Sequence, residues 1–399
     1  MQTPIGIDAL AVAAPQGYLE LADLAEARGV PAGKYVEGLG VHRMAVAQPW
    51  EDPVALAANA ASRLFAQAGA DREQVGLCIV GTETAVDHSK PVAAFLHGLL
   101  QLPQRSRVYE AKHACYGGTA GLFTALDWIA SGSARGRTAL IVCTDIARYQ
   151  LGSAGEPTQG AGAVALLVRE EPRLLELESG TSGSYSRNVD DFWRPLDRKE
   201  ALVDGKLSVQ CYLDALAGAY GEWKKVAPKS SSPLSRRCYH VPYGKMARKA
   251  HRHARMLDGL SEAAADASFD AEVAPSLRLP AEVGNIYSGS LYLALASLLH
   301  FEASALEGQR LGLFSYGSGC TAEYFAGRVV PGAGALAARL GLAQPLSDRR
   351  RYSVPEYERI RAADEQADRS WRGLGDARPG EFAYLGINQD ARRYTQASP

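Results

Sequence analysis

The sequence predicts an α/β fold in which helices cover buried β-sheets. The chain has 399 residues, of which 47% are hydrophobic and 22% charged, which is enough for one large or two medium domains with a sizeable core. Compact apolar runs alternate along the chain with longer segments of helical periodicity, as in sheets covered by helices. We find no short-period repeat and no low-complexity tract, so this alternation is the main structural signal.

The predicted elements follow in chain order. Short apolar runs rich in β-branched residues predict strands at residues 75–80, 138–143, 161–168 and 310–315. Longer helical patterns cover residues 53–68 and 291–306. Residues 170–173 end one strand and mark a seam between two halves, residues 1–170 and 171–399. A tail of mixed charge begins near Ser347, and residues 380–386 within it predict a late strand.

Composition excludes several classes of function. The net charge of −1 argues against a global field for nucleic acid. We find no run of eighteen apolar residues that suggests a membrane span, and the first residues lack the basic and apolar regions of a signal peptide. The six cysteines show no metal-binding spacing, which favours a reducing cytoplasm and no metal site. We therefore expect a cytoplasmic protein with no nucleic-acid or membrane partner.

The segment around Cys115 carries the strongest chemical signal. A short apolar strand ends near Lys112, Cys115 follows at the turn, and a Gly/Ala-rich helix begins behind it. Unpaired N–H groups and the helix dipole at such a position favour the thiolate, which is the form that attacks acyl groups. A buried structural cysteine is the alternative. The strand–Cys–helix context favours the nucleophile.

Two more residues are candidates for acid–base work. Glu83 directly follows the predicted strand at residues 75–80, so its carboxyl can project into a crevice where partial burial raises its pKa. His240 precedes Val-Pro and a helical pattern, and its imidazole could polarise a carbonyl or shuttle a proton. Taken alone, Glu83 could be a surface-loop residue and His240 a structural one.

Two loops of small residues complete the set. Asn285 opens one loop and can hydrogen-bond a substrate carbonyl, while the Gly-rich backbone around Gly317 and Ser318 can supply an oxyanion hole. Each loop by itself could be an ordinary turn. A cysteine on an early helix, followed by a distant histidine and asparagine, is typical of condensing enzymes that handle thioesters.

Several short motifs occur along the chain in the order typical of one enzyme family. They are residues 28–40, Gly81-Thr-Glu-Thr, Ala114-Cys-Tyr, Gly155-Glu-Pro-Thr-Gln-Gly-Ala-Gly-Ala-Val, His240-Val-Pro-Tyr and Asn285-Ile-Tyr-Ser-Gly-Ser. With Glu83 included, nearly the whole sequence resembles the 3-hydroxy-3-methylglutaryl (HMG) synthases of the thiolase-like superfamily. The resemblance implies an acyltransferase.

The resemblance also implies a fold and a division of labour. It implies a five-layered αβαβα sandwich of two thiolase-like halves, with Glu83 and Cys115 in residues 1–170 and His240, Asn285 and Ser318 in residues 171–399. Cys115 would carry the acyl group, Glu83 would be the general acid/base, and His240 would contact the acceptor carbonyl.

The remaining site residues come from the same resemblance. Asn285 and Ser318, next to Gly317, would hold the acyl portion of the acceptor, and Tyr149 would line the acyl pocket. No cofactor would be bound permanently, because the substrates arrive on phosphopantetheine, carried by an acyl carrier protein or by CoA. The resemblance further implies a homodimer.

Two versions of the family differ in the carrier of their thioesters. One makes HMG-CoA, and the other acts on donor and acceptor acyl carrier proteins in polyketide β-branching. The segments around Cys115 and Ser318 resemble the β-branching version more, so we expect that subtype. HMG-CoA synthesis from acetyl-CoA and acetoacetyl-CoA is the alternative.

A basic segment surrounds His240. Between Lys224 and Arg255 there are ten Lys/Arg and no Asp/Glu. Such a segment can steer acidic carrier proteins or CoA phosphates, although it could also be a solvated helix face. The predicted carrier-binding residues are Arg236, Arg237, Lys245, Arg248, Lys249 and Arg252.

Two rival functions come from other classes of protein. A ketoacyl synthase III-like decarboxylative enzyme would also use a Cys–His–Asn set, but would have no need of Glu83. A degenerate thiolase-fold protein that only docks carriers is the non-enzymatic alternative. Retention of Glu83, Cys115 and His240 together argues against it.

Overall fold

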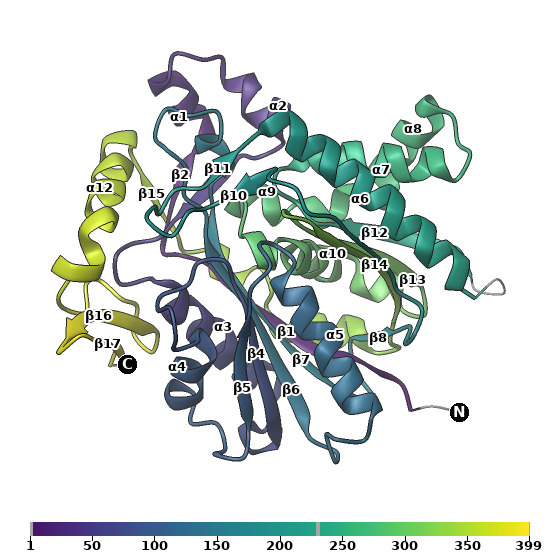
Figure 1. Ribbon diagram of the computed structural model, residues 1–399, viewed down its shortest axis with the longest axis horizontal. Coiled ribbons are helices and arrows are strands. Elements are labelled where there is room, and N and C mark those ends of the chain that lie inside the picture. The colour runs from purple at the N-terminus through teal and green to yellow at the C-terminus, as the bar shows by residue number, and fades with distance from the viewer. Residues whose placement is uncertain (1–2, 229–231, 399) are drawn as a thin grey trace.

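The computed structural model describes residues 3–228 and 232–398, apart from the side chains of residues 365–370. Its largest sheet has ten strands in the order β12-β13-β14-β8-β1-β7-β6-β4-β5, with β9 paired to β14 (Figure 1). The strands are β1 (Ile5–Ala13), β4 (Val75–Gly81), β5 (Arg107–Ala111), β6 (Thr138–Ile146), β7 (Ala161–Glu170), β8 (Leu175–Leu177), β9 (Gly183–Ser186), β12 (Leu234–Tyr239), β13 (Arg310–Gly317) and β14 (Thr321–Val329).

The sheet has two parts that meet at one short pairing. Strands from residues 5–170 form one part and strands from residues 175–329 the other. They join where β1 pairs with β8, through Gly6 with Glu176 and Ile7 with Leu175. The chain crosses between the two parts at residues 171–174, where the sequence suggested a seam. The division into two independent halves stays a prediction.

Helices cover both faces of each part of the sheet. On β4 and β6, Ile79 and Ile141 face the core formed with α5 (Gly117–Ala130), whereas Val80 and Val142 face the core formed with α3 (Pro53–Ala68) and α4 (Val92–Leu99). In the other part, α10 (Ser290–Leu306) packs on β12 and β13, and α6 (Gly205–Val226) packs on β14 and β9. This layered α/β arrangement confirms the predicted fold class.

The remaining elements flank these layers. The helices are α1 (Leu21–Ala27), α2 (Val36–Leu39), α7 (Gly244–Leu257), α8 (Glu262–Glu272), α9 (Pro280–Val283), α11 (Ala333–Leu340) and α12 (Val354–Ser370). The strands are β2 (Gly17–Glu20), β3 (Arg43–Val46), β10 (Phe192–Trp193), β11 (Leu202–Val203), β15 (Arg350–Tyr352), β16 (Phe382–Asn388) and β17 (Ala391–Gln396).

One described segment, Tyr287–Leu306, is long and apolar enough to cross a membrane, and 72% of its most apolar window is buried inside the protein. It contains α10, which packs in the interior against the 3-10 helix at Ala274–Leu277, against β12 and β13, and against α11. Burial in the core accounts for its apolar composition.

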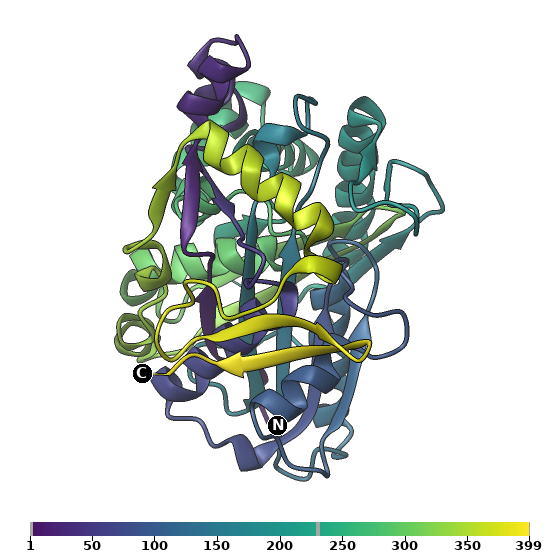
Figure 2. The same cartoon turned by 90° about the vertical axis from the view of Figure 1, so that its left-hand side faces the viewer.

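The C-terminal segment folds back onto the first part of the chain (Figure 2). Strand β15 pairs in parallel with β2, and β16 packs on α3. The predicted late strand at residues 380–386 corresponds to β16. Helix α12 was not predicted, because its buried positions include the polar Tyr357 and Arg361, so no apolar stripe marks it in the sequence.

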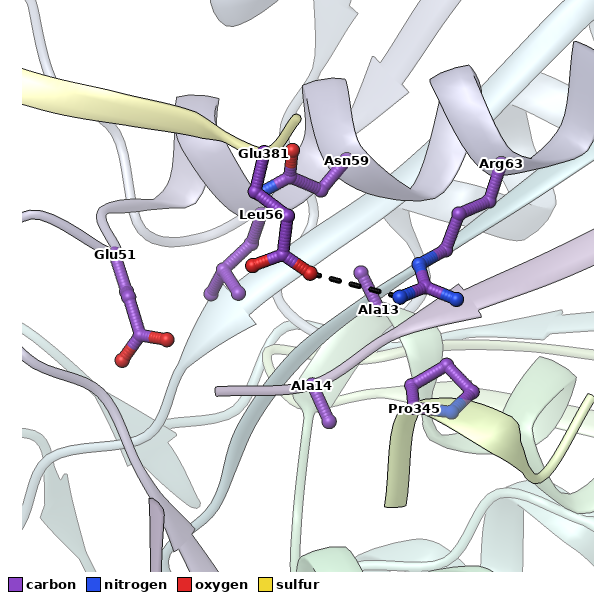
Figure 3. Close-up of a pocket in the computed structure, with 8 residues that line it drawn as sticks. All are labelled: Ala13, Ala14, Glu51, Leu56, Asn59, Arg63, Pro345 and Glu381. Carbon is purple, nitrogen blue, oxygen red and sulfur yellow. Dashed lines mark ion pairs between the residues drawn. The ribbon is translucent and has the colours of Figure 1, made fainter. Parts of the chain in front are cut away.

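Polar contacts attach the β16–β17 hairpin to α3. The Asn59 side chain accepts a hydrogen bond from the Phe382 N–H at 2.7 Å and donates one to the Phe382 carbonyl at 3.1 Å. One turn along α3, Arg63 pairs with Glu381 at 3.5 Å (Figure 3). A single amide side chain therefore satisfies both backbone groups at the start of β16.

We expect Asn59→Ala to loosen this hairpin, because the substitution leaves the Phe382 backbone groups without partners. The cost should be about 1–3 kcal/mol for the docking of residues 380–396. Hydrogen exchange should show faster exchange of β16 amides. Gln67→Ala, on the same helix, is the control. Equal protection of β16 in the two variants would contradict this account.

Candidate active site

The end of β4 and the start of α5 approach each other unusually closely. A Cβ on Gly81 would lie 2.2 Å from the Gly118 nitrogen, so only glycine permits this crossing. Two residues beyond Gly81 lies Glu83, and two residues before α5 lies Cys115. The backbone packing therefore brings together the two residues that the sequence singled out.

Cys115 and Glu83 are in direct contact. The Cys115 thiol donates a hydrogen bond to Glu83 Oε1 at 3.2 Å. Ala114, just before the cysteine, has a φ of 39°, which strains a non-glycine residue and turns the chain sharply at this point. A nucleophile on such a strained turn is exposed to one side of the site rather than packed in the sheet.

The state of the thiol differs from the sequence-based expectation. Burial, followed by the charge and hydrogen bond of Glu83, raises the pKa of Cys115 well above its usual value. The expected stabilisation of a thiolate by the N-terminus of α5 is therefore wrong for the free protein, because the carboxyl group and the low solvation outweigh the helix dipole. The resting residue is a thiol that points to Glu83.

The surroundings of Glu83 raise the pKa of its carboxyl group and so favour the neutral form. Burial, followed by the charge of Asp145, raises the pKa of Glu83 to about 8, against the opposing charge of Arg194 and the hydrogen bond from Cys115. A carboxyl group with this pKa exchanges its proton readily near neutral pH, which is what a general acid/base needs.

Asp145, at the end of β6, holds three segments in place. Its Oδ1 accepts hydrogen bonds from the Thr82 hydroxyl, the Glu83 N–H and the Thr84 hydroxyl at 2.8–2.9 Å. Its Oδ2 accepts from the Ser288 N–H at 3.0 Å and from the Ser288 hydroxyl at 2.5 Å. Asp145 is fully buried, and five donors suit an ionised carboxylate, which can only accept.

His240 follows β12 and is buried, at 2% exposure. The backbone of His240 is fixed on both sides. The backbone N–H donates to the Phe314 carbonyl at 2.7 Å, and the backbone carbonyl accepts from the Tyr212 hydroxyl at 2.8 Å. Burial lowers the pKa of His240 to about 3, so its imidazole is neutral at physiological pH. A neutral imidazole can hydrogen-bond a carbonyl or a developing alkoxide.

The two small-residue loops lie around the same region. Asn285 Oδ1 accepts hydrogen bonds from the Tyr287 N–H at 2.9 Å and the Ser290 hydroxyl at 2.8 Å. Its amide NH₂ has no partner among the described residues, which leaves a donor for a substrate. A Cβ on Gly317 would lie 2.7 Å from the Tyr116 nitrogen, so the Gly317–Ser318 loop lies against the Cys115 turn. Their binding roles stay predictions.

Aromatic rings form a wall beside the thiol. Tyr149 and Phe192 meet edge to face at 6.4 Å between centroids, and Phe192 and Tyr287 do so at 5.8 Å. Burial raises the pKa of Tyr149, and the nearby charges of Cys115 and Glu83 add to this shift. The Tyr149 side chain therefore lies close enough to Cys115 and Glu83 to be affected by their charges, and its place in the acyl pocket stays a prediction.

Most of the basic segment is neutralised by acidic partners. Four of the six predicted carrier-binding residues form ion pairs: Arg236 with Glu302, Arg237 with Glu272, Arg248 with Asp270, and Arg252 with Glu262 and Asp266. Arg237 is also 5% exposed, so it cannot serve as a carrier surface, which corrects the expectation. The partners come from α8 and α10, which are outside the basic segment in sequence.

For two lysines of that segment the predicted role stays a prediction. Lys245 and Lys249 lie one turn apart on α7, which begins four residues after His240. Neither has an acidic partner in the part of the chain that the structure describes. Lys229, in the same basic run, lies outside the described residues.

Three charged residues near the site were not predicted from the sequence. Asp145 lies at the end of β6, which is parallel to β4, so its position at a strand end was a usable signal. Asp191 accepts from the Tyr316 hydroxyl at 2.7 Å and the Gly319 N–H at 2.9 Å, and Arg194 acts on Glu83 through its charge. Both lie in the segment between β9 and α6, where no local pattern indicates them. Within the described residues, no cluster of three His, Cys, Asp or Glu could hold a metal ion.

Comparison with known proteins covers almost the whole chain. A family model for the N-terminal part of hydroxymethylglutaryl-coenzyme A synthase matches residues 2–172, and the model for the C-terminal part matches residues 175–262 and 253–371. The hydroxymethylglutaryl-CoA synthase of Enterococcus faecalis is 40% identical over 367 residues, which span 91% of this chain and 93% of that protein.

Two solved structures are similar over nearly their full length. MvaS in complex with 3-hydroxy-3-methylglutaryl coenzyme A has a TM-score of 0.94 and 49% identity, and the match covers 100% of each chain. The HMG synthase of the curacin biosynthetic pathway, in complex with holo donor-ACP, has a TM-score of 0.91 and 32% identity, with 99% of this chain and 100% of that chain covered.

The protonation of Cys115 can be measured by alkylation with iodoacetamide. Because only the thiolate reacts, the rate should be low at pH 7 and rise about tenfold per pH unit below the thiol pKa. Glu83→Gln removes a charge that raises this pKa, so the variant should react faster at a fixed pH. Mass spectrometry of the labelled peptide gives the rate.

Glu110→Gln, the same change at the nearby end of β5, is the control and should leave the rate unchanged. Slower alkylation of Glu83→Gln would contradict this account, since it would mean that Glu83 promotes removal of the thiol proton more than its charge opposes it.

Proposed function

The chain belongs to the hydroxymethylglutaryl synthase family, acyltransferases of thiolase-like fold that convert an acyl group to an alkyl group on transfer, and from this we propose that it makes an HMG thioester on CoA. The observation that carries the proposal is the contact between the Cys115 thiol and Glu83, a carboxyl group whose pKa is about 8. Cys115 holds the acyl unit, and Glu83 can take a proton from that unit.

The first step is transfer of an acetyl group. Cys115 Sγ attacks the carbonyl of acetyl-CoA, the C–S bond to CoA breaks, and CoA leaves as the thiol. The thiol proton departs as this bond forms and passes to the sulfur of the leaving CoA, so Glu83 stays free to act in the next step. Binding of the thioester is therefore coupled to deprotonation of Cys115.

The second step forms the new carbon–carbon bond. Ionised Glu83 removes a proton from the methyl group of acetyl-Cys115, and the resulting enolate attacks the C3 ketone of acetoacetyl-CoA. Neutral His240 donates a hydrogen bond to the developing alkoxide, and the proton that Glu83 took from the methyl group then neutralises this oxygen. Water then cleaves the Cys115 thioester, which releases a carboxylate and restores the thiol.

The carrier of the substrates decides between the two versions of the family. The 49% identity to MvaS, which was solved with HMG-CoA, exceeds the 32% identity to the curacin enzyme solved with a donor-ACP, and this supports CoA over the β-branching subtype expected from the sequence. The ion pairs that neutralise Arg236, Arg237, Arg248 and Arg252 remove much of the charge argument for an acidic carrier protein. Lys245 and Lys249 remain to bind phosphate.

Assembly and location are also proposals. Strand β5 ends the large sheet, and its outer edge pairs with no other described strand, which supports a homodimer formed along that edge. The six cysteines are free thiols, which supports action in the cytoplasm.

A decarboxylative ketoacyl synthase would give Glu83 no task, and carbon dioxide release from a malonyl thioester would be its signature.

Glu83→Ala should separate the two chemical steps. The variant should still acquire an acetyl group on Cys115, because the nucleophile is intact, but it should condense at least about 10²-fold more slowly, because the base is absent. Intact-protein mass spectrometry gives the adduct and product analysis gives the turnover. Cys115→Ala is the control without an adduct. Normal turnover by Glu83→Ala would rule out the assignment.

Thioester preference should be tested with all pairings of donor and acceptor. Acetyl-CoA or an acetylated carrier protein is combined with acetoacetyl-CoA or an acetoacetylated carrier protein, and every thioester is followed by mass spectrometry. We expect the CoA–CoA pairing to condense fastest. A strong preference for carrier protein on either side would return the assignment to polyketide β-branching.

A further inference from the structure

Helix α12 contacts the segment that carries Tyr149, although it lies about two hundred residues further along the chain. Three of its residues take part: Tyr357, Arg361 and Asp364. They are four and three positions apart, so they lie on one face of the helix. The segment that they contact runs from Arg148 to Gln159, between β6 and β7.

Arg361 holds the Tyr149 carbonyl directly and the Tyr149 N–H indirectly, through Gln159. It donates one hydrogen bond to Gln159 Oε1 and another to the Tyr149 carbonyl, the second at 3.2 Å. Gln159 Oε1 in turn accepts the Tyr149 N–H at 2.8 Å. Arg361 is 8% exposed and Gln159 4%, so these contacts are shielded from water. The peptide on each side of the Tyr149 side chain is thereby fixed by one guanidinium group.

Tyr357 fixes the far end of the same segment. Its hydroxyl accepts from Gln159 Nε2 at 2.7 Å and donates to Glu156 Oε1 at 3.2 Å. Glu156 is 1% exposed and pairs with Arg28 at 2.7 Å. These contacts join buried polar groups of α12 to both ends of the segment, although Arg361 Nε has no hydrogen-bond partner among the described residues. The hydrogen bonds that are made restrict the local geometry.

Asp364 completes the face at the start of the segment. It accepts two hydrogen bonds from Arg148, the residue next to Tyr149, one of them at 2.7 Å. The Tyr149 ring itself packs against Gly155, where a Cβ would lie 2.7 Å from the ring, and against Phe192. Polar contacts to α12 therefore hold the backbone, while aromatic and glycine contacts hold the ring.

We infer that Arg361 is a positioning residue for the acyl pocket: through Tyr149 and Gln159 it sets how large an acyl group Cys115 accepts. The inference rests on the proposed function, in which Tyr149 lines the pocket for the group on Cys115. Loss of Arg361 frees the Tyr149 carbonyl and the Gln159 side chain from their buried donor. The Tyr149 ring can then shift, and an acyl group one methylene larger than acetyl fits better.

The test compares two donors in five proteins. Acylation of Cys115 by acetyl-CoA and by propionyl-CoA is followed by intact-protein mass spectrometry, and the ratio of their kcat/KM values is determined for each protein. They are the wild type, Arg361→Met, Arg361→Lys, Tyr357→Phe and, as the matched control, Arg359→Met. Arg359 is exposed on the same helix and has no hydrogen bond or ion pair among the described residues.

We expect Arg361→Met to lower the acetyl-to-propionyl ratio about tenfold, since one methylene in a pocket changes selectivity by at least about this factor. Arg361→Lys should recover part of the ratio, and Arg359→Met should keep that of the wild type. A purely structural role would reduce the amount of folded enzyme and scale both rates equally, leaving the ratio unchanged. Tyr357→Phe, which removes only a hydroxyl, should shift the ratio in the same direction by a smaller factor.

The outcomes separate this inference from the proposed function. An unchanged ratio in both Arg361→Met and Tyr357→Phe, with Cys115 still acylated, overturns the inference alone. Absence of any adduct on Cys115 of the wild type, from either donor, overturns the proposed function and the inference with it.

Discussion

The buried carboxylate of Asp145 is the interaction on which the site depends. It collects donors from the end of β4 and from the turn before α10, two segments about two hundred residues apart in sequence. Its five hydrogen bonds compensate for the burial of a charge that would otherwise be very unfavourable. The same charge acts on the chemistry, because it helps to raise the pKa of Glu83 to about 8. One residue thus both positions the proposed general base, Glu83, and keeps it able to exchange a proton near neutral pH.

Low solvation sets the protonation state of each proposed catalytic group. Burial is the largest cause of the raised pKa of Cys115, of the raised pKa of Glu83 and of the lowered pKa of His240. The free site therefore holds its proton-bearing groups close to neutral: a thiol, a carboxyl group near its midpoint and an uncharged imidazole. In the proposed reaction, negative charge develops only on the enolate and the alkoxide, where Arg194 and His240 can stabilise it. Such an arrangement suits chemistry that passes through an enolate and an alkoxide.

Much of the fold could be predicted because its signals are local. The apolar runs at β4, β6, β7 and β13 and the helical patterns at α3 and α10 are continuous in sequence, and the structure has an element at each. Helix α12 could not be predicted in this way, because the face that it buries is polar and its partners lie in the segment between β6 and β7. Its stability depends on contacts that exist only after the chain has folded back.

The sequence by itself determined which residues could do the chemistry: Cys115 before a helix, Glu83 after a strand and His240 before a helix, each recognisable from residue type and local pattern. Tertiary structure decided the protonation states of these residues and which charged side chains have an opposite charge beside them. It placed Glu83 against Cys115, so that the thiol is protonated in spite of the helix N-terminus. It also brought the acidic residues of α8 onto Arg237, Arg248 and Arg252, and so neutralised part of a basic segment that contains no acid in sequence. Solvation and pairing with distant charges are properties of the packed molecule, and no local pattern carries them.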